Sequence, residues 1–229
     1  MASLTMDWIA LNTALSEDLA HWQAAVQAHP DDAGAWVRCG MAHFRLGQVA
    51  ASIAAFDRAE QVRPALTPYL WQRGLSRYYA GEFEAGAAQF EADLAVNGRD
   101  VEETVWCYLC LARSRSPAAA RAALLPVGRD PRPVLRQVYR LFAGEITPQD
   151  LVQVGQQAGD RGEFYSALYG GLYCEVTGED AQAQAWITRA VEKCCPDDYM
   201  WHLARVHGSR RGWLSPPSGL LSEGALDPG

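Results

Sequence analysis

Two cysteines with the spacing of redox and zinc-binding motifs are the most chemically suggestive feature of this sequence. Cys107 and Cys110 form a C-x-x-C pair, which occurs in disulfide oxidoreductases and as one half of a zinc site. A zinc site needs a second pair, and the only nearby candidates, Cys194 and Cys195, are adjacent in sequence. Redox pairs follow a strand, whereas this pair lies within the run Trp-Cys-Tyr-Leu-Cys-Leu. We therefore expect both thiols to be buried packing groups.

The histidines do not complete a catalytic or metal-binding motif either. His202 and His207 could join Cys194 and Cys195 around a metal, but they are five residues apart and so do not share a helix face. Their spacing fits no standard zinc scheme. His43 is expected to be a hydrogen-bonded core residue. No phosphate-binding glycine loop, nucleophile elbow or H-E-x-x-H pattern occurs. The sequence predicts no catalytic residue, no metal, no cofactor and no enzymatic activity.

Composition favours a helical globular protein that works away from nucleic acid and membranes. The 229 residues are 49% hydrophobic and 21% charged, with abundant alanine and few alternating segments. The net charge of -7 and the lack of a basic cluster argue against nucleic acid. No apolar run is long enough to span a bilayer. The N-terminus is acidic, unlike a signal or transit peptide, so a cytoplasmic location is expected, or an organellar one if the N-terminus was trimmed.

An internal repeat organises the chain. Three pairs of identical residues are each 34 positions apart: Gly40 and Gly74, Gly47 and Gly81, Phe56 and Phe90. The first unit predicts a helix from Ala33 to Leu46, a turn at Gly47 and a second helix from Val49 to Val62. Small residues at Gly40 and Ser52 indicate where the two helices cross closely.

These residues resemble the tetratricopeptide repeat, a hairpin of two helices. The first unit matches the repeat pattern at Trp36, Gly40, Ser52, Phe56, Ala59 and Pro64, and the second at Leu70, Gly74, Gly86 and Phe90. Asp93 stands where the pattern has alanine. A third match uses the same spacing at Gly171, Gly178, Ala183, Ile187 and Ala190.

The resulting prediction is an all-α solenoid of tetratricopeptide-type hairpins with an inserted helical segment. Its parts are N-terminal cap helices at 1–32, repeat units at 33–113, an inserted segment at 114–162, a C-terminal repeat unit at 163–207 and a disordered tail at 208–229. The repeat units comprise two good hairpins and one degenerate first helix. The tail is predicted from five Gly, three Pro and four Ser among its residues.

The order of these parts resembles the NlpI-like family of bacterial tetratricopeptide proteins. The resemblance rests on that order and on the segment from Trp106 to Leu111. It implies a protein that forms homodimers and acts as an adaptor, bringing hydrolases to their targets. The chain lacks the export signal and lipobox cysteine of that family, so membrane anchoring is not implied.

The repeat resemblance also implies where a partner would bind, because the first helix of each hairpin lines a concave groove. The residues at the groove positions are apolar or aromatic, of the kinds that anchor interfaces: Val37, Met41, Phe44, Trp71, Leu75, Tyr78 and Tyr79. Val37 and Met41 replace the Lys and Asn with which related proteins hold acidic chaperone tails. We therefore predict an adaptor or scaffold that holds a hydrophobic or amphipathic protein segment. The alternative is a structural or self-associating subunit whose groove is buried by its own cap helix or by segment 114–162.

Overall fold

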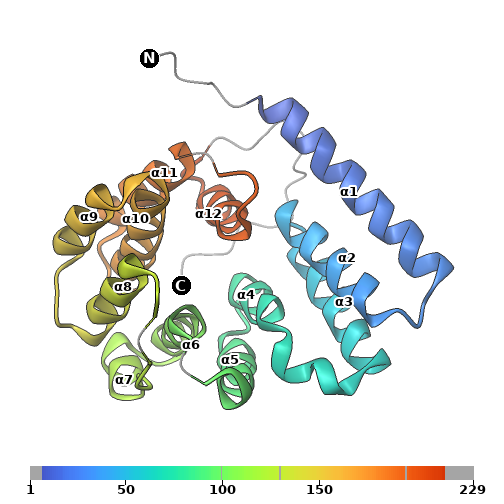
Figure 1. The fold of residues 1–229 in the computed structure, drawn as a ribbon, viewed down its shortest axis with the longest axis horizontal. Coiled ribbons are helices and arrows are strands. Elements are labelled where there is room, and N and C mark those ends of the chain that lie inside the picture. The colour runs from blue at the N-terminus through green and yellow to red at the C-terminus, as the bar shows by residue number, and fades with distance from the viewer. Residues whose placement is uncertain (1–6, 99, 129, 194, 215–229) are drawn as a thin grey trace.

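The fold is an all-α, tetratricopeptide-like solenoid, as the repeat pattern predicts. A computed structural model describes residues 7–98, 100–128, 130–193 and 195–214. Helices make up 79% of the structure, and no strand occurs in this described part. Successive helices follow a curved path that closes around α12 (Tyr199–Arg210), which lies on the inner side of the curve (Figure 1).

The N-terminal half of the curve consists of a long first helix followed by antiparallel hairpins. Its helices are α1 (Trp8–Ala28), α2 (Ala33–Arg45), α3 (Val49–Val62), the 3₁₀ helix η1 (Pro64–Tyr69), α4 (Trp71–Tyr79), α5 (Phe83–Asn97) and α6 (Val101–Ser114). Helix α1 packs on α2, α2 on α3, and α4 on α5. The predicted boundaries of the first hairpin are confirmed to within one residue.

The second half continues the same curve. Its helices are α7 (Pro117–Ala122), α8 (Pro133–Ala143), α9 (Pro148–Gln157), α10 (Gly159–Val176), α11 (Asp180–Glu192) and α12. The segment predicted as an insertion supplies α7, α8 and α9, which lie between α6 and α10 along the curve (Figure 1). It does not enter the concave side. The division of the chain into functional units stays a prediction.

Close helix crossings explain the repeated glycines. A Cβ added to Gly40 would lie 3.0 Å from the Phe56 ring, and one added to Gly74 would lie 2.7 Å from the Phe90 ring. Ser52 donates a hydrogen bond from its hydroxyl to the carbonyl of Gly40 at 2.8 Å. The same crossing recurs between α10 and α11, which the third sequence match predicted. The prediction that small residues mark the crossings is confirmed.

A buried arginine joins the first two hairpins. Arg73 on α4 is 4% exposed and donates to Glu60 at 2.8 and 3.0 Å, to Asp57 at 3.0 Å and to Gln89 at 2.8 Å. These partners lie on α3 and α5, so one side chain connects three helices. The hydrogen bond from Arg73, with smaller charge effects, lowers the pKa of Glu60 to about 2 despite partial burial. Full pairing is what allows a guanidinium to be buried at this place.

The C-terminal end differs from the predicted tail. Helix α12 continues through Arg210, and Gly208 is buried beneath the side chain of Leu214. Trp213 packs beside the ring of His207, at 5.4 Å between centroids. Residues 208–214 are thus part of the packed structure, because they cover the end of α12. The rest of the predicted tail, 215–229, lies outside the described residues.

Candidate partner-binding site

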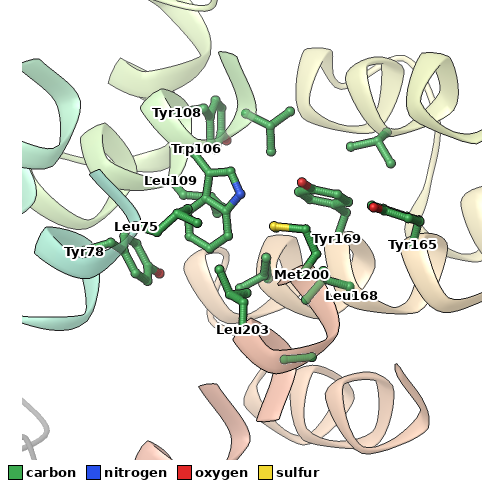
Figure 2. Close-up of a cluster of buried hydrophobic side chains, with 14 of the residues drawn as sticks. Leu75, Tyr78, Trp106, Tyr108, Leu109, Tyr165, Leu168, Tyr169, Met200 and Leu203 are labelled. Carbon is green, nitrogen blue, oxygen red and sulfur yellow. The ribbon is translucent and has the colours of Figure 1, made fainter. Parts of the chain in front are cut away.

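The concave face, where the sequence predicted a groove for a partner, is filled by α12. Tyr199 at the start of α12 stacks on Phe44 of α2 at 5.7 Å and meets Trp71 of α4 edge-on at 5.8 Å. Further along, Met200 and Leu203 project toward Trp106 of α6, between the α4 side and the α10 side (Figure 2). This helix therefore bridges both ends of the curve through apolar contacts.

The predicted groove residues divide into two groups by exposure. Four are buried, with exposed fractions of 0% for Phe44, 1% for Leu75, 2% for Tyr78 and 1% for Tyr79. Three are partly exposed: Val37, Met41 and Trp71. The buried group packs in the main core, together with α12 and α6. In this arrangement only the second group can touch another molecule, and partner binding by any of the seven stays a prediction.

The partly exposed residues form what we call the rim cluster, defined as Val37, Met41, Trp71 and Tyr199. Val37 and Met41 are one turn apart on α2 and so lie on the same face. Met41 accepts a weak hydrogen bond at its sulfur from Gln72 of α4, at 3.9 Å. Trp71 is held in place by Tyr199, as described above. The cluster is an apolar edge where α2, α4 and α12 meet.

A polar chain fixes the other end of α12 inside the concave face. The hydroxyl of Tyr79 on α4 forms a hydrogen bond with Nδ1 of His207 at 3.1 Å. Nε2 of His207 lies 3.6 Å from Glu175 on α10. Glu175 also accepts from Arg211, just beyond α12. The chain therefore ties α4, α12 and α10 together.

This Tyr–His–Glu arrangement has the elements of a catalytic triad but not its accessibility. Burial lowers the pKa of His207 to about 4, outweighing the opposite effect of Glu175. Burial would raise the pKa of Glu175, but His207 when it is protonated, together with the charge and hydrogen bond of Arg211, holds this pKa below its usual value. His207 is fully buried and Tyr79 is 1% exposed, so no substrate atom can approach within hydrogen-bond distance. We interpret the chain as structural.

The C-x-x-C pair has the packing role that the sequence predicted. Cys107 is 7% exposed and Cys110 is fully buried, and both thiols are free. Burial raises the pKa of Cys107 to about 12 and that of Cys110 well above its usual value. Thiolate, the reactive and metal-binding form, is therefore disfavoured at both positions. The Cys110 sulfur fills the space beside Gly86, where an added Cβ would lie 2.9 Å away.

The histidines have separate structural roles. His202 on α12 is bonded through Nε2 to the carbonyl of Pro196 at 2.8 Å. Cys194 lies outside the described residues, and no cluster of potential metal ligands occurs in the rest. His43 was predicted to be a core residue, which is wrong: it is partly exposed and bonds the side chain of Gln48 at 2.6 Å across the turn after α2.

Sequence reasoning missed that α12 supplies part of the site. Tyr199 and His207 contact residues of α2 and α4 that are far away in the chain, so no local pattern reveals the pairing. A signal was nevertheless present. Positions 200–206 read Met-Trp-His-Leu-Ala-Arg-Val, with apolar residues on every side of the helix. Such a helix is buried all round rather than lying on a surface, as all seven residues are here.

Comparison with known proteins also indicates a tetratricopeptide-like protein, through a match that covers only part of the chain. No protein-family model matches the sequence. A stretch of 68 residues is 34% identical to Superkiller protein 3 of Saccharomyces cerevisiae, which contains tetratricopeptide repeats. The match covers 30% of this chain and 5% of that relative. The chain is thus similar to tetratricopeptide proteins in fold and in part of its sequence, and a relationship to the NlpI-like family is not confirmed. None of the described helices combines the length and hydropathy needed to cross a bilayer.

Proposed function

We propose that this chain is a non-enzymatic protein-interaction adaptor that holds a segment of a partner protein at the rim cluster. The observation that carries the proposal is the partial exposure of Val37, Met41 and Trp71 beside a concave face that α12 fills. A preformed surface loses little conformational entropy on binding, so the ordering cost falls mainly on the partner. Tryptophan, tyrosine and methionine are enriched at interface centres.

The similarity of part of the chain to a repeat protein also supports this proposal. Among the reactive groups that the sequence raised, Cys107, Cys110 and His207 are buried, whereas Cys195 and His43 are partly exposed. The partner segment is expected to be apolar or amphipathic, because the rim cluster carries no charged side chain.

The test is affinity capture from a native lysate with the wild-type chain and two variants. Trp71→Ala removes the largest partly exposed ring and should weaken partner binding by about 2 kcal/mol, roughly thirtyfold in Kd. Tyr69→Ala is the matched control, because Tyr69 is 52% exposed and lies outside the rim cluster. Equal recovery of the partner by Trp71→Ala and wild type, with both folded, would show that the rim cluster is not the binding site.

The second candidate is a structural, self-associating subunit, which the internal filling of the concave face by α12 favours. In that case the exposed apolar residues, such as Ile9 at 74% exposure, would contact another copy. Light scattering over a range of concentrations separates the two candidates. A mass that rises with concentration supports self-association, and a constant monomer mass excludes it.

A further inference from the structure

A second buried arginine lies where α1 and α12 meet, and no carboxylate of the described residues pairs with it. Arg205 is 5% exposed, close to the 4% of Arg73. Arg73 has Asp57 and Glu60, whereas Arg205 forms no ion pair with any described residue. It donates only to Nδ1 of His202 at 3.3 Å and to the side-chain oxygen of Asn12 at 3.4 Å, both long bonds.

Two tryptophans cover this guanidinium. Its carbon lies 5.1 Å from the ring centroid of Trp8 and 5.3 Å from that of Trp201, and the two rings are stacked at 6.2 Å. Cation–π contact offsets part of the burial cost, but it does not neutralise the charge. Burial, with no opposing carboxylate, lowers the pKa of Arg205 to about 10. The chain has 27 Asp and Glu residues against 20 Lys and Arg residues, so it has enough carboxylates to pair with every basic side chain.

The nearby carboxylates are already engaged. Asp18 on α1 pairs with Arg45 of α2 at 3.0 Å. Asp198, which caps α12, accepts from Arg161 at 3.1 Å and from Tyr165 at 3.0 Å. Burial is the main cause that lowers the pKa of His202 to about 4, and the positive charges of Arg205 and Arg45 lower it further. The junction therefore has an excess of positive charge.

Unused hydrogen-bond donors lie in the same region. The hydroxyl of Tyr199 and the Nε of Arg45 are buried without a hydrogen-bond partner among the described residues, and so is Oδ2 of Asp18, the ion-pair partner of Arg45. Tyr199, His202 and Arg205 follow one another at three-residue spacing along α12, so they form a continuous stripe that begins at the rim cluster. Buried donors without acceptors are costly, and a bound anion would satisfy them.

Trp8 is the most exposed of the side chains that contact the guanidinium of Arg205. This residue is 39% exposed and lies in the first turn of α1, next to the exposed side chain of Ile9. The start of α1 extends past the end of α2 toward α12 (Figure 1). Helix ends open at low free-energy cost, so Trp8 can move aside without disrupting the rest of the helix. Trp8 and Ile9 make this entrance apolar apart from the carboxylate of Asp7, which caps α1, and the interior carries the charge of Arg205.

We propose that the junction of α1, α2 and α12 binds a side-chain carboxylate of the partner protein, flanked there by apolar side chains. One uncompensated guanidinium matches the single charge of a carboxylate better than the charge of about -2 of a phosphate. The apolar entrance at Trp8 and Ile9 suits aliphatic neighbours of the acid. This inference rests on the proposed function, and it adds the chemical character of the bound segment.

The test uses blocked pentapeptides labelled with a neutral fluorophore, Leu-Glu-Leu-Glu-Leu and its glutamine counterpart, in fluorescence anisotropy. Wild type should bind the glutamate peptide at least about tenfold more tightly, which corresponds to about 1.4 kcal/mol from charge-assisted hydrogen bonds. Asn12→Asp places a carboxylate at the existing contact of Arg205. It should abolish the preference and raise the thermal midpoint. Gln23→Glu adds the same charge at an exposed position of α1 and should leave the preference intact.

Three results would overturn the assignment. The first is an unchanged glutamate preference in Asn12→Asp, or no preference in wild type. The second is displacement of the peptide by inorganic phosphate but not by acetate, which would replace carboxylate by phosphate as the ligand. The third is tighter peptide binding by the Glu223→Gln/Asp227→Asn double variant. This result would mean that the chain's own C-terminal carboxylates compete with the peptide for the site. The adaptor proposal is tested by partner capture with Trp71→Ala, and the carboxylate site is tested by peptide binding. Failure of one test therefore does not decide the other.

Discussion

The substitution Asp93→Asn is expected to stabilise the protein, by an amount that grows as the pH rises from about 4 to 7. Asp93 stands at the repeat position that the tetratricopeptide pattern gives to alanine, on α5 where it packs against α6. Its side chain is fully buried. One carboxyl oxygen accepts from Gln89 at 3.1 Å, and the other has no hydrogen-bond partner among the described residues. Burial and the charge of Glu103 raise the pKa of Asp93 from 3.8 to about 7.

The sign of the effect follows from proton binding. Since the pKa is higher in the folded state, the folded chain binds more protons than the unfolded chain between pH 3.8 and 7. The contribution of Asp93 to stability is thus fully present below pH 3.8 and is lost as pH rises through 7. Three pKa units correspond to an upper limit of about 4 kcal/mol, and we expect roughly half after local relaxation. Asparagine keeps the bond from Gln89 and cannot ionise.

Urea unfolding at several pH values measures this difference. Asp93→Asn should exceed wild type by about 2 kcal/mol at pH 8, or by roughly 4–8 °C in Tm for a chain of this size, and the gain should shrink toward pH 5. Glu91→Gln on the exposed face of the same helix is the control and should show no such trend. A variant that is less stable than wild type at pH 8 would refute the reasoning, because it would mean that the native state holds an ionised, well-partnered Asp93.

Three further predictions follow from the packing. Gly74→Ala should destabilise by about 1–3 kcal/mol in chemical unfolding, because its Cβ would overlap the Phe90 ring. His207→Phe should cost about 1–3 kcal/mol above pH 6.5 by leaving its polar neighbours unpaired. That cost should shrink as pH falls toward 4, because the depressed pKa makes wild type lose the histidine's contribution over this interval. Cys107 and Cys110 should react with a thiol reagent only at the rate of unfolding; fast reaction in the native state would contradict their burial.

The hairpins could be predicted because their determinants are local. In each of the first two hairpins, a glycine lies against a phenylalanine ring where the two helices cross, and these residues recur every 34 positions. A second glycine adopts a left-handed conformation in the turn between the helices, at Gly47 with φ 75° and at Gly81 with φ 79°. The second hairpin deviates at its start, where Pro68 lies in η1 and α4 begins only at Trp71. The ring of Pro68 fixes the backbone there and removes an N–H donor, which explains why α4 starts late. This proline is visible in the sequence.

The state of the concave face could not be predicted, because it depends on contacts between distant parts of the chain. Repeat positions indicate which side chains point inward, and Phe44 and Tyr79 do so. They do not indicate what meets them there. The predicted candidates were the cap helix and the segment 114–162, but Tyr199 and His207 of α12 contact Phe44 and Tyr79 there. The missing partner of Arg205 was equally invisible, since charge pairing across helices requires the three-dimensional arrangement.

The central structural claim is that α12 fills the concave face in the native state and leaves the rim cluster for a partner. Amide hydrogen exchange of the full chain tests it most directly. If α12 fills the concave face, the amides of Trp201, Leu203 and His207 should exchange as slowly as those of α6 and α10, through global unfolding. Much faster exchange in α12, with α2 and α4 still protected, would contradict the account, because it would mean that α12 leaves the concave face and exposes Phe44, Tyr78 and Tyr79.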